Sequence, residues 1–78
     1  MWIMTQNKTD LVDVLKISVS NVLAAKNVLI IGKFAPSSVF HTNEMILGTY
    51  SSLDEAKAEL KNIQEHIKSG ILDVYEMK

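Results

Sequence analysis

The fold is decided by residues 50–78, which read YSSLDEAKAELKNIQEHIKSGILDVYEMK. Residues 52–55 have the S-x-x-E form of a capping box, in which the serine oxygen accepts from the glutamate amide and the glutamate reaches back to the serine amide. Apolar side chains then recur every three or four positions on one helix face; they are Leu53, Ala56, Leu60, Ile63 and Ile67. Gly70 suits the left-handed residue that often ends a helix. We therefore predict an amphipathic helix over residues 52–69.

Two strands are predicted on either side of this helix. Residues 44–50, EMILGTY, lead directly into it and are rich in residues that favour strands. Residues 71–77, ILDVYEM, end with acidic and apolar side chains in alternation. Because charge at an edge discourages further pairing, this second segment is expected to be a short strand at the edge of a sheet.

A central strand is predicted at residues 28–31, where Val-Leu-Ile-Ile is apolar at every position. Such a strand must be covered on both sides or lie at a contact between copies of the chain. Residues 24–27 have the composition of a turn before it. Pro36 has no amide hydrogen for a ladder, so the strand must end before that residue.

The N-terminal part is expected to form a hairpin whose second apolar segment, which begins at residue 11, is interrupted. Residues 2–6 favour a strand, and the polar residues 7–10 favour a turn. Apolar residues occupy even positions in residues 12–14 but odd positions in residues 15–20. One straight strand cannot bury both sets, which predicts a bulge or break near Val14 and Leu15. The alternative is a helix from Asp10, but the abundant valine, isoleucine and serine favour strand.

Together these segments predict an α+β fold. We expect an antiparallel sheet of four to five short strands, one C-terminal amphipathic helix packed on one face, and a short terminal strand. The 78 residues suffice for a single domain, and the hydrophobic content of 47% allows a core. That core is small, and the chain has no cysteine with which to add a disulfide. Self-association is therefore an expected supplement to stability.

Charge and hydropathy limit the classes of partner. Eight basic residues oppose nine acidic ones, and no two basic residues are adjacent. Nucleic-acid binders depend on clustered lysine and arginine, so the composition argues against that class. A basic face would have to be assembled in space from Lys8, Lys16, Lys26 and Lys33. Residues 1–25 have no signal-peptide pattern, and no segment approaches the roughly 20 apolar residues of a membrane span. We expect a cytoplasmic protein without a membrane partner.

No residue pattern predicts catalysis, a metal site or a cofactor. The two histidines, His41 and His66, have no ligand spacing around them, and there is no thiolate. The three glycines are isolated, so no phosphate-binding loop is present. Ser37 and Ser38 precede His41 in a segment of loop composition, where hydrogen bonding within the loop explains them better than nucleophilic chemistry. The chain is not expected to be an enzyme or to bind a cofactor.

The predicted contact residues are Phe34, Val39, Phe40 and His41. Residues 35–43 read as a polar loop, and a large apolar side chain in such a loop often marks a contact surface. The leading hypothesis is a non-enzymatic interaction module that associates with itself through residues 28–31 or an exposed sheet edge. The alternatives are an accessory protein that binds a host protein through the loop, and a nucleic-acid-binding protein.

Two short motifs carry a resemblance. Trp2 is followed by Gln6-Asn7-Lys8, and Leu47-Gly48-Thr49-Tyr50-Ser51 precedes a helix that contains Ala56. In these features the chain resembles a group of small uncharacterised proteins of Gram-positive bacteria and their phages. The match leaves residues 15–43 unsupported. The resemblance implies a genomic setting in a prophage or mobile element, and it implies no activity.

Overall fold

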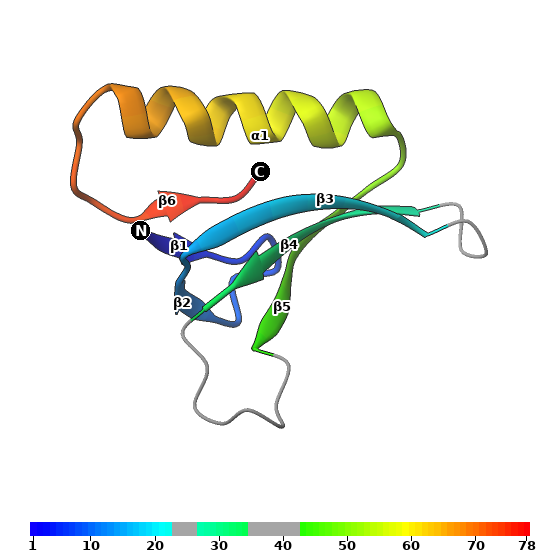
Figure 1. Ribbon diagram of the computed structural model, residues 1–78, viewed down its shortest axis with the longest axis horizontal. Coiled ribbons are helices and arrows are strands. Elements are labelled where there is room, and N and C mark those ends of the chain that lie inside the picture. The colour runs from blue at the N-terminus through cyan, green and yellow to red at the C-terminus, as the bar shows by residue number, and fades with distance from the viewer. Residues whose placement is uncertain (23–26, 35–42) are drawn as a thin grey trace.

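The computed structural model describes residues 1–22, 27–34 and 43–78. Over these ranges the chain forms six strands and one helix (Figure 1). In chain order the elements are β1 (Trp2–Met4), β2 (Leu11–Asp13), β3 (Lys16–Val22), β4 (Asn27–Lys33), β5 (Glu44–Tyr50), α1 (Leu53–Lys68) and β6 (Tyr75–Glu76). The predicted α+β class and C-terminal helix are confirmed. The expected turn at residues 24–27 falls largely outside the described residues.

The strands form two sheets of three strands, where one sheet of four to five strands was predicted. The larger sheet has the order β3-β4-β5 and is antiparallel throughout. The smaller sheet has the order β2-β1-β6, in which β1 pairs antiparallel with β2 and parallel with β6. Strand β6 is an edge strand, as predicted, but it covers only Tyr75–Glu76 and not the whole predicted segment 71–77. In Figure 1 it lies between α1 and β1, near the N-terminus.

The two sheets meet at the predicted break after β2. The Val14 amide donates to the Met1 carbonyl oxygen at 2.9 Å, whereas the Leu15 amide donates to the Lys33 carbonyl oxygen at 2.7 Å. Neighbouring residues are therefore bonded to different sheets, which explains the change of phase in the hydrophobic pattern. Val14 is buried in the core, and Leu15 points outward with 74% of its surface exposed.

Gln6 joins the smaller sheet to the outer edge of β5. Its amide donates to the Leu47 carbonyl oxygen, and its side-chain oxygen accepts from the Thr49 amide, both at 2.8 Å. The β4–β5 register shifts between Ile30 and Ile31, so that Leu47 lies in a bulge with its side chain buried. The bulge and Gln6 together protect this edge from further pairing.

Helix α1 begins and ends as the sequence predicts. The Glu55 amide donates to Ser52 Oγ at 3.1 Å, which is the expected N-cap bond. The return bond differs from the prediction, because the Glu55 carboxylate accepts from Ser51 Oγ at 2.6 Å and from the Ser51 amide at 3.2 Å. At the other end Gly70 adopts a positive φ of 75°, as the left-handed C-terminal position requires.

The core lies between α1, the inner face of β3-β4-β5 and the smaller sheet. Its largest fully buried side chains are Ile3, Ile30, Leu47 and Ile63. The central strand β4 is confirmed, and Val28 and Ile30 point into this core. Leu29 and Ile31 are half-buried on the opposite face of the sheet. Strand β4 is therefore apolar on both faces, but only one of these faces is fully covered.

Candidate interaction surface

Helix α1 is rotated away from the orientation that its apolar stripe predicts. Its buried residues are Ala56, Glu59 and Ile63. Ile67 belongs to the stripe but is 59% exposed, and Leu53 is also exposed. At about 100° per residue, Ala56 and Ile63 project close together on the circumference of the helix, with Glu59 on one side of them and Ile67 on the other. The helix therefore turns a carboxylate inward and part of its apolar stripe outward, which leaves apolar surface for another contact.

Glu59 is 3% exposed and is held by hydrogen bonds from three donors. Its Oε1 accepts from Tyr75 Oη at 3.1 Å and from Asn62 Nδ2 at 3.0 Å. Its Oε2 accepts from the Lys78 amide at 2.6 Å. A buried carboxylate is costly unless hydrogen bonds replace its hydration. This network therefore satisfies Glu59 and fixes the segment around β6 beneath α1.

The same carboxylate affects both tyrosines. Burial, with the charge of Glu59 as the second cause, raises the pKa of Tyr50 to about 12. Burial also raises the pKa of Tyr75 well above its usual range, and the charge and hydrogen bond of Glu59 add to that effect. Tyr50 Oη donates to the Lys78 carbonyl oxygen at 3.0 Å. Both phenols therefore act as structural donors that stay neutral at ordinary pH.

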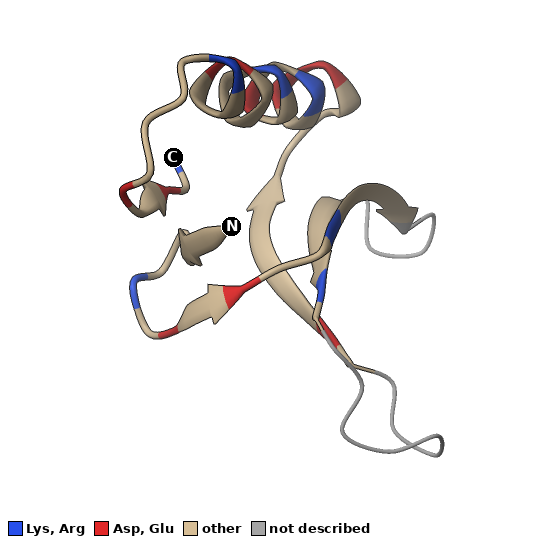
Figure 2. Ribbon diagram, turned by 60° about the vertical axis from the view of Figure 1, so that its left-hand side comes forward, with Lys and Arg blue, Asp and Glu red and all other residues tan. Residues whose placement is uncertain are grey.

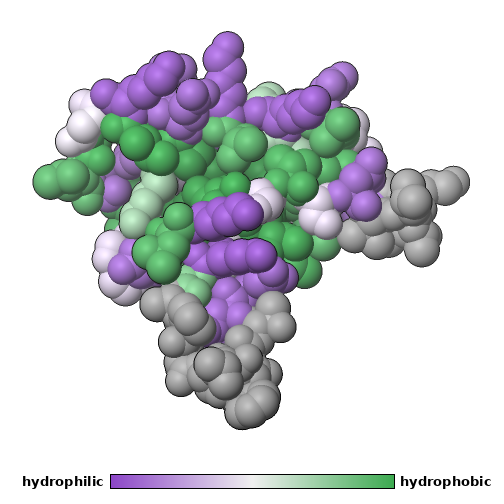
Figure 3. Space-filling model, viewed as in Figure 1, coloured by the Kyte–Doolittle hydropathy of each residue, from purple (hydrophilic) through white to green (hydrophobic). Residues whose placement is uncertain are grey.

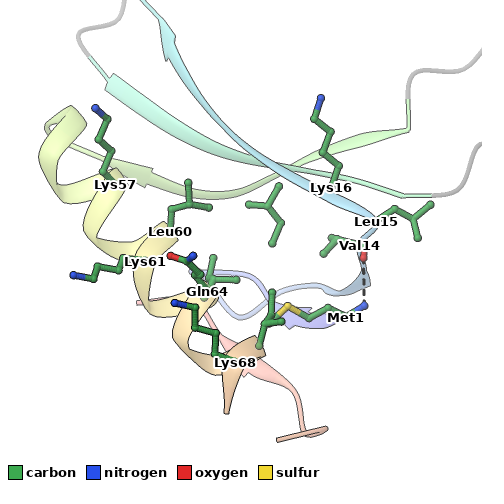
Figure 4. A pocket seen from close by; sticks show the side chains of 12 residues that line it. Met1, Val14, Leu15, Lys16, Lys57, Leu60, Lys61, Gln64 and Lys68 are labelled. Carbon is green, nitrogen blue, oxygen red and sulfur yellow. Dashed lines mark hydrogen bonds between the residues drawn. The ribbon is translucent and has the colours of Figure 1, made fainter. Parts of the chain in front are cut away.

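A groove runs between α1 and the start of β3 (Figure 4). Its volume is about 780 Å³, and its walls come from segments about forty residues apart in the sequence. The apolar residues that line it are Met1, Val14, Leu15, Ile17, Leu60, Ile63 and Ile67. In Figure 3 hydrophobic residues are exposed in a band beneath the hydrophilic side chains of the helix. We call this feature the α1–β3 groove.

Four lysines line the α1–β3 groove. Lys16 belongs to the β3 wall, and Lys57, Lys61 and Lys68 belong to the α1 wall (Figure 4). No aspartate or glutamate lines it, and none of the four lysines forms an ion pair within the described part of the chain. Figure 2 shows lysines and acidic residues along α1 and further charged residues on the strands and turns. The groove is therefore apolar at its floor and positive at its rims.

A second apolar surface lies next to the groove, at the C-terminal end of α1. Four exposed side chains form it, and we call it the terminal patch: Trp2, Ile67, Ile71 and Leu72. Leu72 is 99% exposed. The patch surrounds a hollow of about 230 Å³. His66 and Asp73 also line this hollow, and His66 Nε2 lies 3.4 Å from Asp73 Oδ1.

Of the predicted contact residues, only Phe34 lies in the described part of the chain, and it lines neither the groove nor the hollow of the patch. Phe34 is half-buried, packs against the core and donates its amide to the Asn43 carbonyl oxygen at 3.0 Å. Val39, Phe40 and His41 lie outside the described residues. Sequence reasoning missed both the α1–β3 groove and the terminal patch. A signal for the patch was available in Ile71 and Leu72, two apolar residues that follow the helix-ending glycine and that the sequence pattern places in a strand.

Of the lysines proposed for a nucleic-acid face, Lys16 and Lys33 are cross-strand partners on β3 and β4. Lys8 pairs with Glu76, and Lys33 pairs with Glu44. Lys16 lines the groove, and Lys26 lies outside the described residues. Within the described ranges, no group of three or more histidine, cysteine, aspartate or glutamate side chains could hold a metal ion. His66 instead contacts Asp73 and packs edge-on against Tyr75, with ring centroids 5.2 Å apart.

Comparison with known proteins found no matching protein family, no matching curated protein and no matching solved structure. In the described part of the chain no helix is both long and apolar enough to cross a membrane.

Proposed function

We propose that this chain is a small, non-enzymatic protein-interaction module that associates with a second copy of itself through the terminal patch. The observation that carries the proposal is Leu72, an aliphatic side chain with 99% of its surface in solvent, beside the exposed Ile67 and Ile71. Single exposed apolar residues are common, but adjacent ones that form a patch are typical of interaction sites. The proposal that the module is not an enzyme is supported by the α1–β3 groove, where the titratable side chains of the described residues are all lysines.

A second copy of the chain is the partner that suits the terminal patch. In the described ranges no lysine lines the hollow of the patch, and the histidine and aspartate that line it contact each other. Two copies related by a two-fold axis can therefore bring their patches together without placing unpaired charges of one sign in contact. The core has only ten buried hydrophobic residues in the described chain, so burial of a further apolar surface adds usefully to stability.

The test is the mass of the protein in solution, measured by sedimentation over a wide concentration range. We expect the parent chain to pass from monomer to dimer as its concentration rises, and Leu72→Ser to stay monomeric. Leu72 makes no core contact, so its substitution should leave the fold intact, which circular dichroism will check. Leu15→Ser is the matched control, because Leu15 is exposed but lies outside the patch. A parent chain that stays monomeric at its highest concentration would overturn the proposal.

A second candidate function is binding of another protein, as an accessory protein that modulates a host protein would do. The observation that favours it is the set of four lysines around the α1–β3 groove, none of which forms an ion pair among the described residues. Charge that is left unpaired around an apolar floor favours a partner of opposite charge.

A further inference from the structure

We propose that the α1–β3 groove binds an acidic amphipathic helix of another protein. Three kinds of observation support this occupant, namely the rotation of α1, the sign of the charge at the rims, and the spacing of that charge along the groove. The inference goes beyond self-association, which uses the terminal patch. Met1 and Ile67 line both surfaces, so the experiment below is designed to separate the two.

The rotation of α1 supplies the apolar half of the site. Because Glu59 faces inward, Ile67 and the half-buried Leu60 face the groove rather than the centre of the core. Ile17 and Leu15 stand on the opposite wall. An amphipathic helix placed between these walls would bury its apolar stripe against aliphatic side chains from both, which is the usual mode of helix-in-groove recognition.

The rims supply the charged half of the site. Lysines stand on both walls, with Lys16 across the groove from the α1 lysines (Figure 4). No carboxylate lines the groove to neutralise them. A partner with acidic residues on both flanks of its apolar stripe would therefore meet positive charge on each side. This complementarity favours the orientation and the rate of binding as well as the affinity.

The spacing of the lysines sets the length of the partner. Lys57 and Lys68 are separated by about 17 Å along the axis of α1, at about 1.5 Å per residue. Lys57 and Lys61 are one helical turn apart, so acidic residues at positions i and i+4 of a parallel helix match them. A partner of about twelve residues, or three turns, would cover the α1 wall.

Two other classes of anionic ligand fit the groove less well. A fatty acid carries one charge at one end and is bound best where most of its surface is enclosed, whereas the four lysines are distributed along an open groove. Single-stranded nucleic acid needs aromatic side chains on which bases can stack. Among the described residues, those that line the groove include no aromatic side chain.

The experiment uses a fluorescent synthetic helix with leucines at positions i, i+3, i+7 and i+10 and glutamates on both flanks. Binding is measured by anisotropy on the Leu72→Ser variant, which leaves the groove unchanged and removes self-association as a cause of any signal. We expect saturable binding that weakens as salt rises. A peptide of the same composition, scrambled so that its leucines share no face, and one with lysine in place of glutamate should not bind.

Substitutions in the groove locate the site. Lys57→Gln/Lys61→Gln should weaken binding of the acidic peptide by about tenfold. Lys57→Glu/Lys61→Glu should instead favour the lysine peptide. Lys8→Gln is the control, because Lys8 lies outside the groove and pairs with Glu76. The proposal is wrong if the acidic peptide does not bind at low salt, if the groove substitutions do not affect it, or if dodecanoate or oligo-dT binds there and the peptide does not.

Discussion

The backbone amide of Lys78 lies 2.6 Å from Oε2 of Glu59, so the segment after β6 is bonded to a carboxylate in the middle of α1. The two residues are nineteen positions apart. The Lys78 carbonyl oxygen also accepts from Gln6 Nε2 and from Tyr50 Oη, both at 3.0 Å. This one residue therefore links the helix, the larger sheet and the smaller sheet, and it explains why a charged side chain is buried in so small a core.

Glu59→Ala should lower the free energy of unfolding by about 2–3 kcal/mol, because the Tyr75 hydroxyl and the Lys78 amide would lose their acceptor inside the protein. Glu59→Gln should cost less, since its amide oxygen still accepts from one donor. Urea denaturation of each variant measures the change. Glu65→Ala is the matched control on the exposed face of the same helix and should stay within about 0.5 kcal/mol of the parent. Equal losses for Glu59→Ala and Glu65→Ala would contradict a structural role for the buried carboxylate.

The tyrosines should make the fold sensitive to alkaline pH. An unfolded tyrosine has a pKa of about 10, whereas burial and the charge of Glu59 raise the pKa of Tyr50 to about 12 and also raise that of Tyr75. The unfolded chain therefore loses these protons first as the pH rises. The stability that they contribute is complete below pH ~10 and is lost as the pH passes from ~10 to ~12.

Ultraviolet absorbance of the phenolate measures this titration directly. The folded chain should show no ionisation of either tyrosine near pH 10, and the chain in concentrated urea should show both ionising there. Tyr50→Phe leaves Tyr75 as the only tyrosine, so the remaining transition belongs to that residue. A folded chain that titrates like the unfolded chain would show that these phenols are not buried beside Glu59.

Gly32→Ala should destabilise the fold by about 1–3 kcal/mol through overpacking. A Cβ at Gly32 would lie 2.8 Å from Val14 Cγ1 and 3.0 Å from Leu47 Cδ1, and both of those side chains are buried. The double variant Val14→Ala/Gly32→Ala should lose less than the sum of the two single variants, because the smaller side chain relieves the contact. Thermal or urea unfolding of the four proteins in this cycle checks the coupling. Strict additivity would contradict the close approach.

Much of this fold could be predicted from local sequence patterns. The capped helix, the β5 segment and the break at Val14 and Leu15 all follow from residue order and hydrophobic period. The parallel pairing of β1 with β6 could not be predicted, because its partners are more than seventy positions apart and the pairing leaves no local signal. Glu59 was missed for another reason. A charged residue is normally assigned to solvent, although its spacing of three from Ala56 and four from Ile63 places it beside the buried face.

The candidate site was less predictable than the fold. The walls of the α1–β3 groove belong to β3 and α1, and only in the folded chain do Lys16 and Lys61 line the same groove. The sequence correctly indicated that the apolar stripe of the helix exists. It did not indicate how the helix is rotated, because that depends on the hydrogen bonds that hold Glu59 inside. The sequence therefore predicted that the whole apolar stripe of α1 is buried in the core, whereas part of the stripe is exposed at the surface.

Because of that rotation, Ile63 and Ile67 have different roles, although they lie only one turn apart on α1. Ile63 is among the largest fully buried side chains, whereas Ile67 is exposed and lines both the groove and the terminal patch. Ile63→Ala should cost about 2–5 kcal/mol of stability because it leaves a cavity in the core. Ile67→Ala should change the stability of the monomer by no more than about 0.5 kcal/mol.

The measurement is urea unfolding of both variants in the Leu72→Ser background, where dimer formation does not add to the apparent stability. The same Ile67→Ala variant should bind the acidic helical peptide more weakly and, with Leu72 intact, should form less dimer. If Ile67→Ala destabilises the monomer as much as Ile63→Ala does, Ile67 is a core residue and α1 is not rotated as described. If it changes neither stability nor binding, the exposed half of the stripe has no role in either contact.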